Sequence, residues 1–140
     1  MAEHSSFRLR STAIALLGHV GDSTDSPLAV RCLGDPSAQV RAAAAETLAR
    51  IGGPAAESAL CSTLDDRIHF VRAEAAVALG AIGSRGPLPR LLEIARTDRF
   101  RPARAAAQAV GRISPKALAA AAEEPDAGPH LHEAADLSVL

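Results

Sequence analysis

The side chains able to act as nucleophiles or metal ligands are two cysteines, five histidines and 16 carboxylates. The nearest approach to a metal-ligand pattern is formed by His130, His132 and Glu133 close to the C-terminus. A catalytic metal needs about three protein ligands held on a rigid frame. Three neighbouring residues in an acidic tail do not supply that frame, so we expect solvated side chains there, with no metal and no cofactor.

Cys32 and Cys61 do not indicate a catalytic thiol. Both fall in predicted helices, next to positions that hold aliphatic residues elsewhere in the chain, and a buried free cysteine usually behaves as a small hydrophobic residue. Nothing in the pattern brings His19 or His69 beside a cysteine, and no Gly-Lys-Ser/Thr phosphate loop occurs. We therefore predict a protein that is not an enzyme.

The composition favours closely packed helices. The 140 residues include 32 alanines, 14 arginines and one lysine, with three phenylalanines and neither Trp nor Tyr. Alanine is the best helix former and fits the narrow gaps between helices that approach closely. No apolar run reaches the roughly 18 residues of a membrane span, and residues 1–10 lack a signal-peptide core. We therefore expect no membrane insertion and a cytoplasmic location.

A repeat of 31 residues organises the chain. The segment VRAAAAETLARIG at 40–52 matches VRAEAAVALGAIG at 71–83 in eight of 13 positions, and the same step reaches 9–21 and 102–114. Each unit reads as two helices: a longer first helix with an apolar stripe such as Val40, Ala44 and Leu48, and a shorter second helix. The second helices are predicted over 24–33, 54–64, 87–96 and 115–123. Such a unit cannot cover both of its apolar faces, so the units must stack into a solenoid.

Glycines mark the predicted ends of the first helices. Gly21, Gly52 and Gly83 follow the first-helix stripe, where a left-handed C-terminal cap is expected. No segment reads as a strand.

Residues 35–52 resemble the D-P-x-x-x-V-R-x-x-A-A-x-x-L-x-x-I-G signature of short HEAT-like repeats of the phycobilisome-lyase type. The resemblance covers about residues 7–123. It implies an all-α fold, an α-α superhelix of four helix pairs, with units at about 6–36, 37–67, 68–98 and 99–123. Residues 1–123 would form this repeat domain, and 124–140 an acidic tail; residues 117–140 hold five acidic side chains and no Lys or Arg.

An aspartate precedes an arginine by six residues in three units, and the resemblance implies that both are structural. The Asp would cap the next helix, and Asp and Arg would form a ladder along the stack. The residues concerned are Asp35, Arg41, Asp66, Arg72, Asp98 and Arg104. An Asp just before a helix can accept its unpaired N–H groups. The alternative is an anion site built from the three arginines, which we disfavour because each has a carboxylate at a fixed offset.

The resemblance raises two enzymatic functions that must be weighed. Deoxyhypusine hydroxylase resembles these repeats but carries His-Glu iron ligands, and Ala73 stands here where that histidine would be, so its activity is not carried over. The hypothesis that the chain is a lyase-type enzyme subunit, which would transfer a chromophore to a partner, rests on the name of the repeat alone.

Nucleic-acid binding is the stronger rival to protein binding. Five arginines form a basic cluster between positions 96 and 112, namely Arg96, Arg99, Arg101, Arg104 and Arg112. Phosphate contacts need such groups, but base stacking also needs aromatic residues, and only Phe100 lies near. The formal net charge of −1 also argues against a protein that coats nucleic acid. We rank this function below protein binding.

We predict a protein or peptide partner on the concave face of the solenoid, which second helices normally line. Positions outside the core stripes differ from unit to unit there, and the predicted contacts are Arg31, Ser58, Ser62, Arg90, Glu93 and Arg96. The chain would act as a scaffold through shape and charge.

Neither end of the stack carries a clear polar cap. We therefore expect a continuation in a longer protein or a homodimer through an uncapped end. Near the C-terminus, Pro129 can start a short helix that places Leu131, Ala134 and Ala135 on one side. That helix would cap the fourth unit or dock onto another chain, and disorder is the third alternative.

Overall fold

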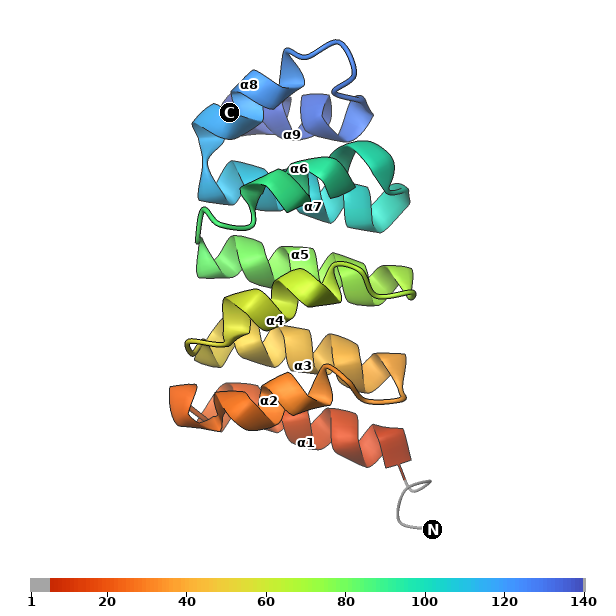
Figure 1. The fold of residues 1–140 in the computed structure, drawn as a ribbon, viewed down its shortest axis with the longest axis vertical. Coiled ribbons are helices and arrows are strands. Elements are labelled where there is room, and N and C mark those ends of the chain that lie inside the picture. The colour runs from red at the N-terminus through yellow and green to blue at the C-terminus, as the bar shows by residue number, and fades with distance from the viewer. Residues whose placement is uncertain (1–5, 140) are drawn as a thin grey trace.

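The computed structural model describes residues 6–139, with side chains described for residues 6–137. Within this range the chain forms nine α-helices and one short 3-10 helix, and no strand. The helices are α1 (Ser6–Val20), α2 (Ser26–Cys32), α3 (Ala38–Ile51), α4 (Ala56–Thr63), α5 (His69–Ile82), α6 (Leu88–Thr97), α7 (Phe100–Ile113), α8 (Pro115–Ala122) and α9 (Pro129–Val139). The fold is an α-solenoid of helix pairs (Figure 1). We call each pair from α1/α2 to α7/α8 a unit.

The helices lie in two layers. The first helices α1, α3, α5 and α7 pack side by side along the stack, whereas α2, α4 and α6 each pack against the first helix of the next unit (Figure 1). The second helices make few contacts with one another. Each unit therefore depends on its successor to cover its apolar surface, as expected for a solenoid.

Small residues set the close spacing of the first helices. A Cβ added to Gly80 of α5 would lie only 2.9 Å from the Cα and Cβ of Ala109 in α7. One added to Gly18 of α1 would lie 3.2 Å from Oγ1 of Thr47 in α3, and that hydroxyl donates a hydrogen bond to the carbonyl oxygen of Ile14. We call these close contacts between successive first helices, at Gly18 and Thr47 and at Gly80 and Ala109, the seam. Its alanine-rich character follows directly from the composition.

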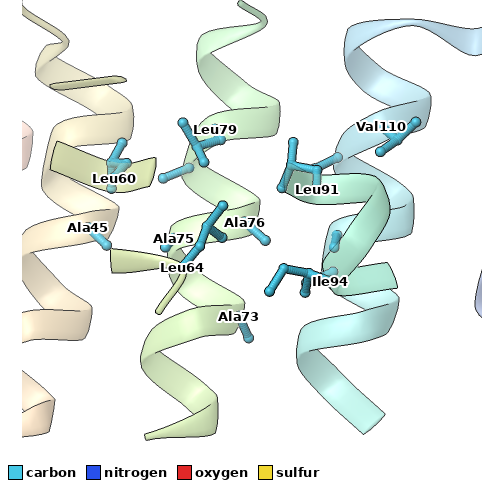
Figure 2. Packing of buried hydrophobic residues seen from close by; sticks show 14 of the residues in the cluster. Ala45, Leu60, Leu64, Ala73, Ala75, Ala76, Leu79, Leu91, Ile94 and Val110 are labelled. Carbon is cyan, nitrogen blue, oxygen red and sulfur yellow. The ribbon is translucent and has the colours of Figure 1, made fainter. Parts of the chain in front are cut away.

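The core lies between the two layers. Leucines at equivalent positions of successive units, Leu48 and Leu79 in first helices and Leu60 and Leu91 in second helices, are fully buried. Figure 2 shows Leu64 of α4 beside α5, and Leu91 and Ile94 of α6 between α5 and α7. Burying a leucine side chain stabilises a fold by about 1.5–3 kcal/mol, so these columns supply much of the driving force.

Two local expectations need correction. Gly83 adopts the left-handed cap, but Gly52 has a positive φ with an extended ψ, and Gly21 is not among the positive-φ residues. The chain leaves α1 through the turn of Asp22 to Asp25, which forms its own capping box. The second helices α2, α4 and α6 also begin one or two residues later than predicted, whereas α8 begins at Pro115 as predicted. Helix α4 starts at Ala56, because Pro54 and Ala55 form the turn before it.

The acidic tail contains a helix that closes the C-terminal end of the stack. Helix α9 packs against α7 and α8, and Leu131 is fully buried beneath it. Ala134 is also buried, while His132, Glu133 and Asp136 face solvent. This is the cap arrangement that solenoid ends require. None of the helices in residues 6–139 is both long and apolar enough to span a membrane.

Candidate partner-binding surface

Ion pairs join each unit to the next along one edge of the stack. Arg41 donates from Nε and Nη2 to the two carboxylate oxygens of Asp66, at 2.7 and 3.0 Å. Arg72 makes the same two-point contact with Asp98, and Arg10 makes it with Asp35. The pairing runs from an arginine on the first helix of one unit to the aspartate in the turn just before the next first helix. Two-point contacts between guanidinium and carboxylate are strong and geometrically specific.

Arg41 and Arg72 also contact the aspartate that lies six residues before each of them in the sequence, but through the main-chain carbonyl of that aspartate and not through its carboxylate. Nη1 of Arg41 donates to the carbonyl oxygens of Asp35 and Pro36, at 2.9 and 3.2 Å. Nη1 of Arg72 likewise donates to the carbonyl oxygen of Asp66 at 2.8 Å. The arginine therefore fixes the turn before its own helix while its other nitrogens hold the following unit.

The aspartates do not cap their helices as expected. The carboxylate of Asp35 accepts a hydrogen bond from the N–H of Ser37, and that of Asp66 from the N–H of Ile68. Ser37 and Ile68 are the residues that precede the first helical turn. Each aspartate lies two residues before them, so its short side chain reaches the turn and not the helix. Arg104, the last predicted member, pairs with Glu133 of α9 at 3.6 Å.

The ion pairs perturb the titration of the aspartates. Hydrogen bonding from Arg10 is the main cause that lowers the pKa of Asp35 below 3.8. Burial alone would raise the pKa of Asp66, but hydrogen bonds from Arg41 and from the N–H of Ile68 outweigh it and leave that pKa lowered. Both carboxylates are therefore ionised and paired at neutral pH.

The predicted partner contacts all lie in the layer of second helices, but the structure engages several of them internally. Arg90 of α6 pairs with Asp65 after α4 and with Glu93 of its own helix. Arg96 pairs with Glu124 after α8. These ion pairs bridge the gaps between α4 and α6 and between α6 and α8, so their charges are largely neutralised.

The gap between α2 and α4 has no such bridge. The residues 31 positions before Asp65 and Arg90 are Gly34 and Ala59, which have no charged side chains. An open groove of about 310 Å³ lies there instead. Its lining is Val30, Leu33, Gly34, Ala59, Ser62, Thr63 and Asp66. We call it the α2/α4 groove.

Arg31 and Ser62 are the predicted contacts closest to this groove. Ser62 lines it and is exposed, and Arg31 is exposed on α2 between Val30 and Leu33. No ion pair involves Arg31 within the residues that the structure describes. Asp66 in the lining is neutralised by Arg41. The groove therefore has apolar and hydroxyl-bearing lining residues, and the exposed Arg31 directly follows the lining residue Val30 on α2. The sequence signal for it is the replacement of a charged pair by Gly34 and Ala59.

The basic cluster predicted from sequence does not form one surface. Arg96 belongs to the second-helix layer, while Arg101 and Arg104 on α7 pair with Glu74 and Glu133. Arg99 and Arg112 stand at opposite ends of the 14-residue α7. These positions do not align the guanidinium groups along one continuous track for a phosphate backbone.

The candidate chemical residues are also dispersed. Cys32 and Cys61 are half-buried on α2 and α4, and burial raises the pKa of both thiols. A raised thiol pKa disfavours the nucleophilic thiolate. His130 is half-buried and His132 exposed on α9. Across residues 6–139 no three His, Cys, Asp or Glu side chains gather in a way that could hold a metal ion.

The stacked helix pairs and their linking ion pairs define a helical-repeat protein. Comparison with known families agrees: the description of HEAT repeats matches residues 1–69 and 26–111. The chain therefore belongs to the HEAT repeat family. HEAT repeats generally mediate protein–protein interactions or serve as scaffolds. No curated protein matches the chain significantly in sequence.

Proposed function

We propose that the chain is a non-catalytic protein-interaction module of the cytoplasm, and that its second-helix face binds a partner at the α2/α4 groove. The observation that carries this proposal is the unbridged gap itself. Ion pairs close the two later gaps in this layer, whereas Gly34 and Ala59 leave the first one open. A recess with an apolar floor and a few polar groups is the usual form of a binding site.

The charge of the groove selects its ligand. Arg31 is cationic, while the carboxylate of Asp66 is already paired with Arg41. A peptide that places a carboxylate near Arg31 and an apolar side chain over Val30 and Leu33 fits this arrangement. Charge complementarity of this kind contributes mainly specificity and rate of association. We therefore expect an acidic peptide segment of a partner protein.

A random peptide library displayed on phage, panned against the full chain, tests the proposal. Enriched peptides should combine an Asp or Glu with a neighbouring apolar residue. The double variant Gly34→Asp/Ala59→Arg should rebuild the bridge seen between Asp65 and Arg90 and weaken binding by about tenfold or more. A Cβ on Gly34 meets only Arg31 O at 3.5 Å, so the variant should fold normally.

Single charge reversals separate the groove from general electrostatics. Arg31→Glu should weaken peptide binding strongly, while Arg85→Glu, an exposed arginine after α5, should leave it nearly unchanged. Failure to enrich any peptide, or binding that survives both the bridging variant and Arg31→Glu, would contradict the proposal. A gel shift with mixed DNA and RNA at low salt tests the alternative of nucleic-acid binding, which predicts salt-dependent retardation.

A further inference from the structure

The N-terminal end of the stack leaves two core positions uncovered. Leu9 and Leu16 of α1 are 68% and 58% exposed, although the residues 31 positions later, Val40 and Thr47, are 0% and 2% exposed. Thr47 faces α1, because its hydroxyl donates to the carbonyl oxygen of Ile14. Thr47 thus faces the first helix of the preceding unit. Leu16 and Leu9 occupy the equivalent positions of α1, so they project from the side of α1 that faces away from α3. That side is the open end of the stack (Figure 1).

This end also holds an apolar recess. A groove of about 300 Å³ between α1 and α2 is lined by Ala13, Ile14, Leu17, Leu28 and Cys32, with Arg10 at its margin. Leu28 is itself 45% exposed. Together with Leu9 and Leu16, these residues form what we call the α1 end face. A contiguous apolar face of this kind marks an interaction site.

A further helix pair stacked in the same register does not fit this face. The inner units place Thr47, Ala78 and Ala109 at the position that faces the preceding first helix, and Leu16 is larger than any of these. A leucine there would prevent the close approach seen along the seam. Position 4 holds His where later units have Asp35 and Asp66, so it offers no carboxylate to the arginine of a preceding unit.

The face is self-complementary, which points to a second copy of the chain. Leu9 and Leu16 are two helical turns apart and lie symmetrically about the exposed residues Thr12 and Ala13. A two-fold axis between Thr12 and Ala13 would place Leu9 of one copy beside Leu16 of the other. The small side chain of Ala13 would stand at the crossing point and permit close approach. The same patch then serves both partners, as a two-fold interface requires.

The charges around α1 agree with an antiparallel arrangement. Arg8 is exposed near the start of α1, and the turn after its end carries Asp22 and Asp25. Antiparallel pairing brings Arg8 of each copy to the end of the interface that holds Asp22 and Asp25 of the other. A parallel arrangement would instead set like charges together. The helix dipoles are also opposed only in the antiparallel arrangement.

We propose that two copies of this chain associate through α1, antiparallel and two-fold symmetric, burying Leu9, Leu16 and Leu28 and closing the N-terminal end of the stack. The interface is separate from the α2/α4 groove, which lies between α2 and α4 and not at the end of the stack.

Sedimentation velocity over a wide concentration range tests the proposal with the full chain. The wild type should show a monomer–dimer equilibrium that weakens as salt is added. Leu16→Glu should raise the dimer dissociation constant by about tenfold or more while the circular dichroism spectrum stays unchanged. Val77→Glu, at another exposed apolar position, should leave the dimer intact. A chain that stays monomeric throughout, or a dimer unaffected by Leu16→Glu, would overturn the proposal.

Cysteine cross-linking tests the position of the two-fold axis. In a background of Cys32→Ser and Cys61→Ser, Ala13→Cys should form a disulfide-linked dimer under mild oxidation. Ala81→Cys, exposed on α5, should not. Cross-linking through position 81 and not 13 would contradict the α1 interface. The Leu16→Glu variant should still bind peptide at the α2/α4 groove, so failure of the dimer proposal can be told apart from failure of the proposed function.

Discussion

Arg41 contacts two separate turns at once: its guanidinium holds both carboxylate oxygens of Asp66 and also donates to the carbonyl oxygens of Asp35 and Pro36. The side chains of Arg41 and Asp66 are only 9% and 10% exposed. One side chain therefore joins α3, the turn before it and the turn before α5. This contact is the centre of the chain of ion pairs along the stack.

Loss of Arg41 should be costly. Arg41→Ala leaves the buried carboxylate of Asp66 without its partner, and we expect the free energy of unfolding to fall by about 3 kcal/mol. Chemical denaturation followed by circular dichroism measures the change. Arg50→Ala is the matched control, because Arg50 is 47% exposed and makes only exposed side-chain contacts, with Glu46 and His19; it should cost about 0.5 kcal/mol or less. Equal losses in the two variants would refute the role given to Arg41.

A methyl group in the seam should be destabilising. Gly80→Ala gains about 1 kcal/mol of helix propensity, but its Cβ would lie 2.9 Å from the Cα and Cβ of Ala109. Forced separation of α5 and α7 should outweigh that gain, for a net loss of about 1–2 kcal/mol. Gly111→Ala is the control, because its Cβ would meet only the end of the Leu118 side chain. Thermal denaturation should place Gly80→Ala below the wild type and Gly111→Ala at or above it.

Acid should weaken the fold through the paired aspartates. The pKa of Asp35 is lowered in the folded state, so its ionised form stabilises the protein above its unfolded pKa of about 3.9. That contribution is lost as the pH falls through the lower, folded pKa. Asp35→Asn should reduce the pH dependence of the free energy of unfolding in this acidic range. Asp126→Asn, at an exposed position before α9, should not, and an identical acid dependence in the two variants would contradict the assignment.

The C-terminal helix should contribute to global stability. Leu131 is fully buried against the fourth unit, whereas Leu137 on the same helix is 54% exposed. We expect Leu131→Ala to lower the free energy of unfolding by about 2–4 kcal/mol. Leu137→Ala should change it by less than about 1 kcal/mol. Unfolding in which Leu131→Ala has no effect would show that α9 is not part of the cooperative unit.

Local periodicity explains what the sequence could predict. The stripes through Leu48 and Leu79 and the alanine-rich first helices depend on spacing within one helix, and the repeat extends that information to every unit. The fold class was therefore predictable, and the structure agrees with it. Packing of the helix Pro129–Val139 onto the fourth unit is one of three alternatives that the sequence leaves open, because its few apolar residues do not reveal which surface they meet.

The partners of charged side chains could not be read in this way. Arg41 does contact Asp35, six residues before it, but the acceptor is the main-chain carbonyl of Asp35. The carboxylate that pairs with Arg41 belongs to Asp66, 25 residues later. Arg90 and Arg96 were predicted as partner contacts from their variable positions. The structure pairs them with Asp65 and Glu124, which only the three-dimensional stack brings near. That second helices line a concave face stays a prediction.

The ion pairs between units give the stack a direction. Each arginine reaches forward to the aspartate of its successor, and each aspartate keeps its main-chain N–H donor even without that arginine. A fragment shortened from the C-terminus after α4 would remove Asp66 and leave Arg41 solvated and still bonded to the carbonyl oxygens of Asp35 and Pro36. A fragment shortened from the N-terminus before α5 would leave Asp66 solvated and still bonded to Ile68. Trimming from either end thus removes one partner of the ion pair and leaves the other bonded to the main chain of its own turn.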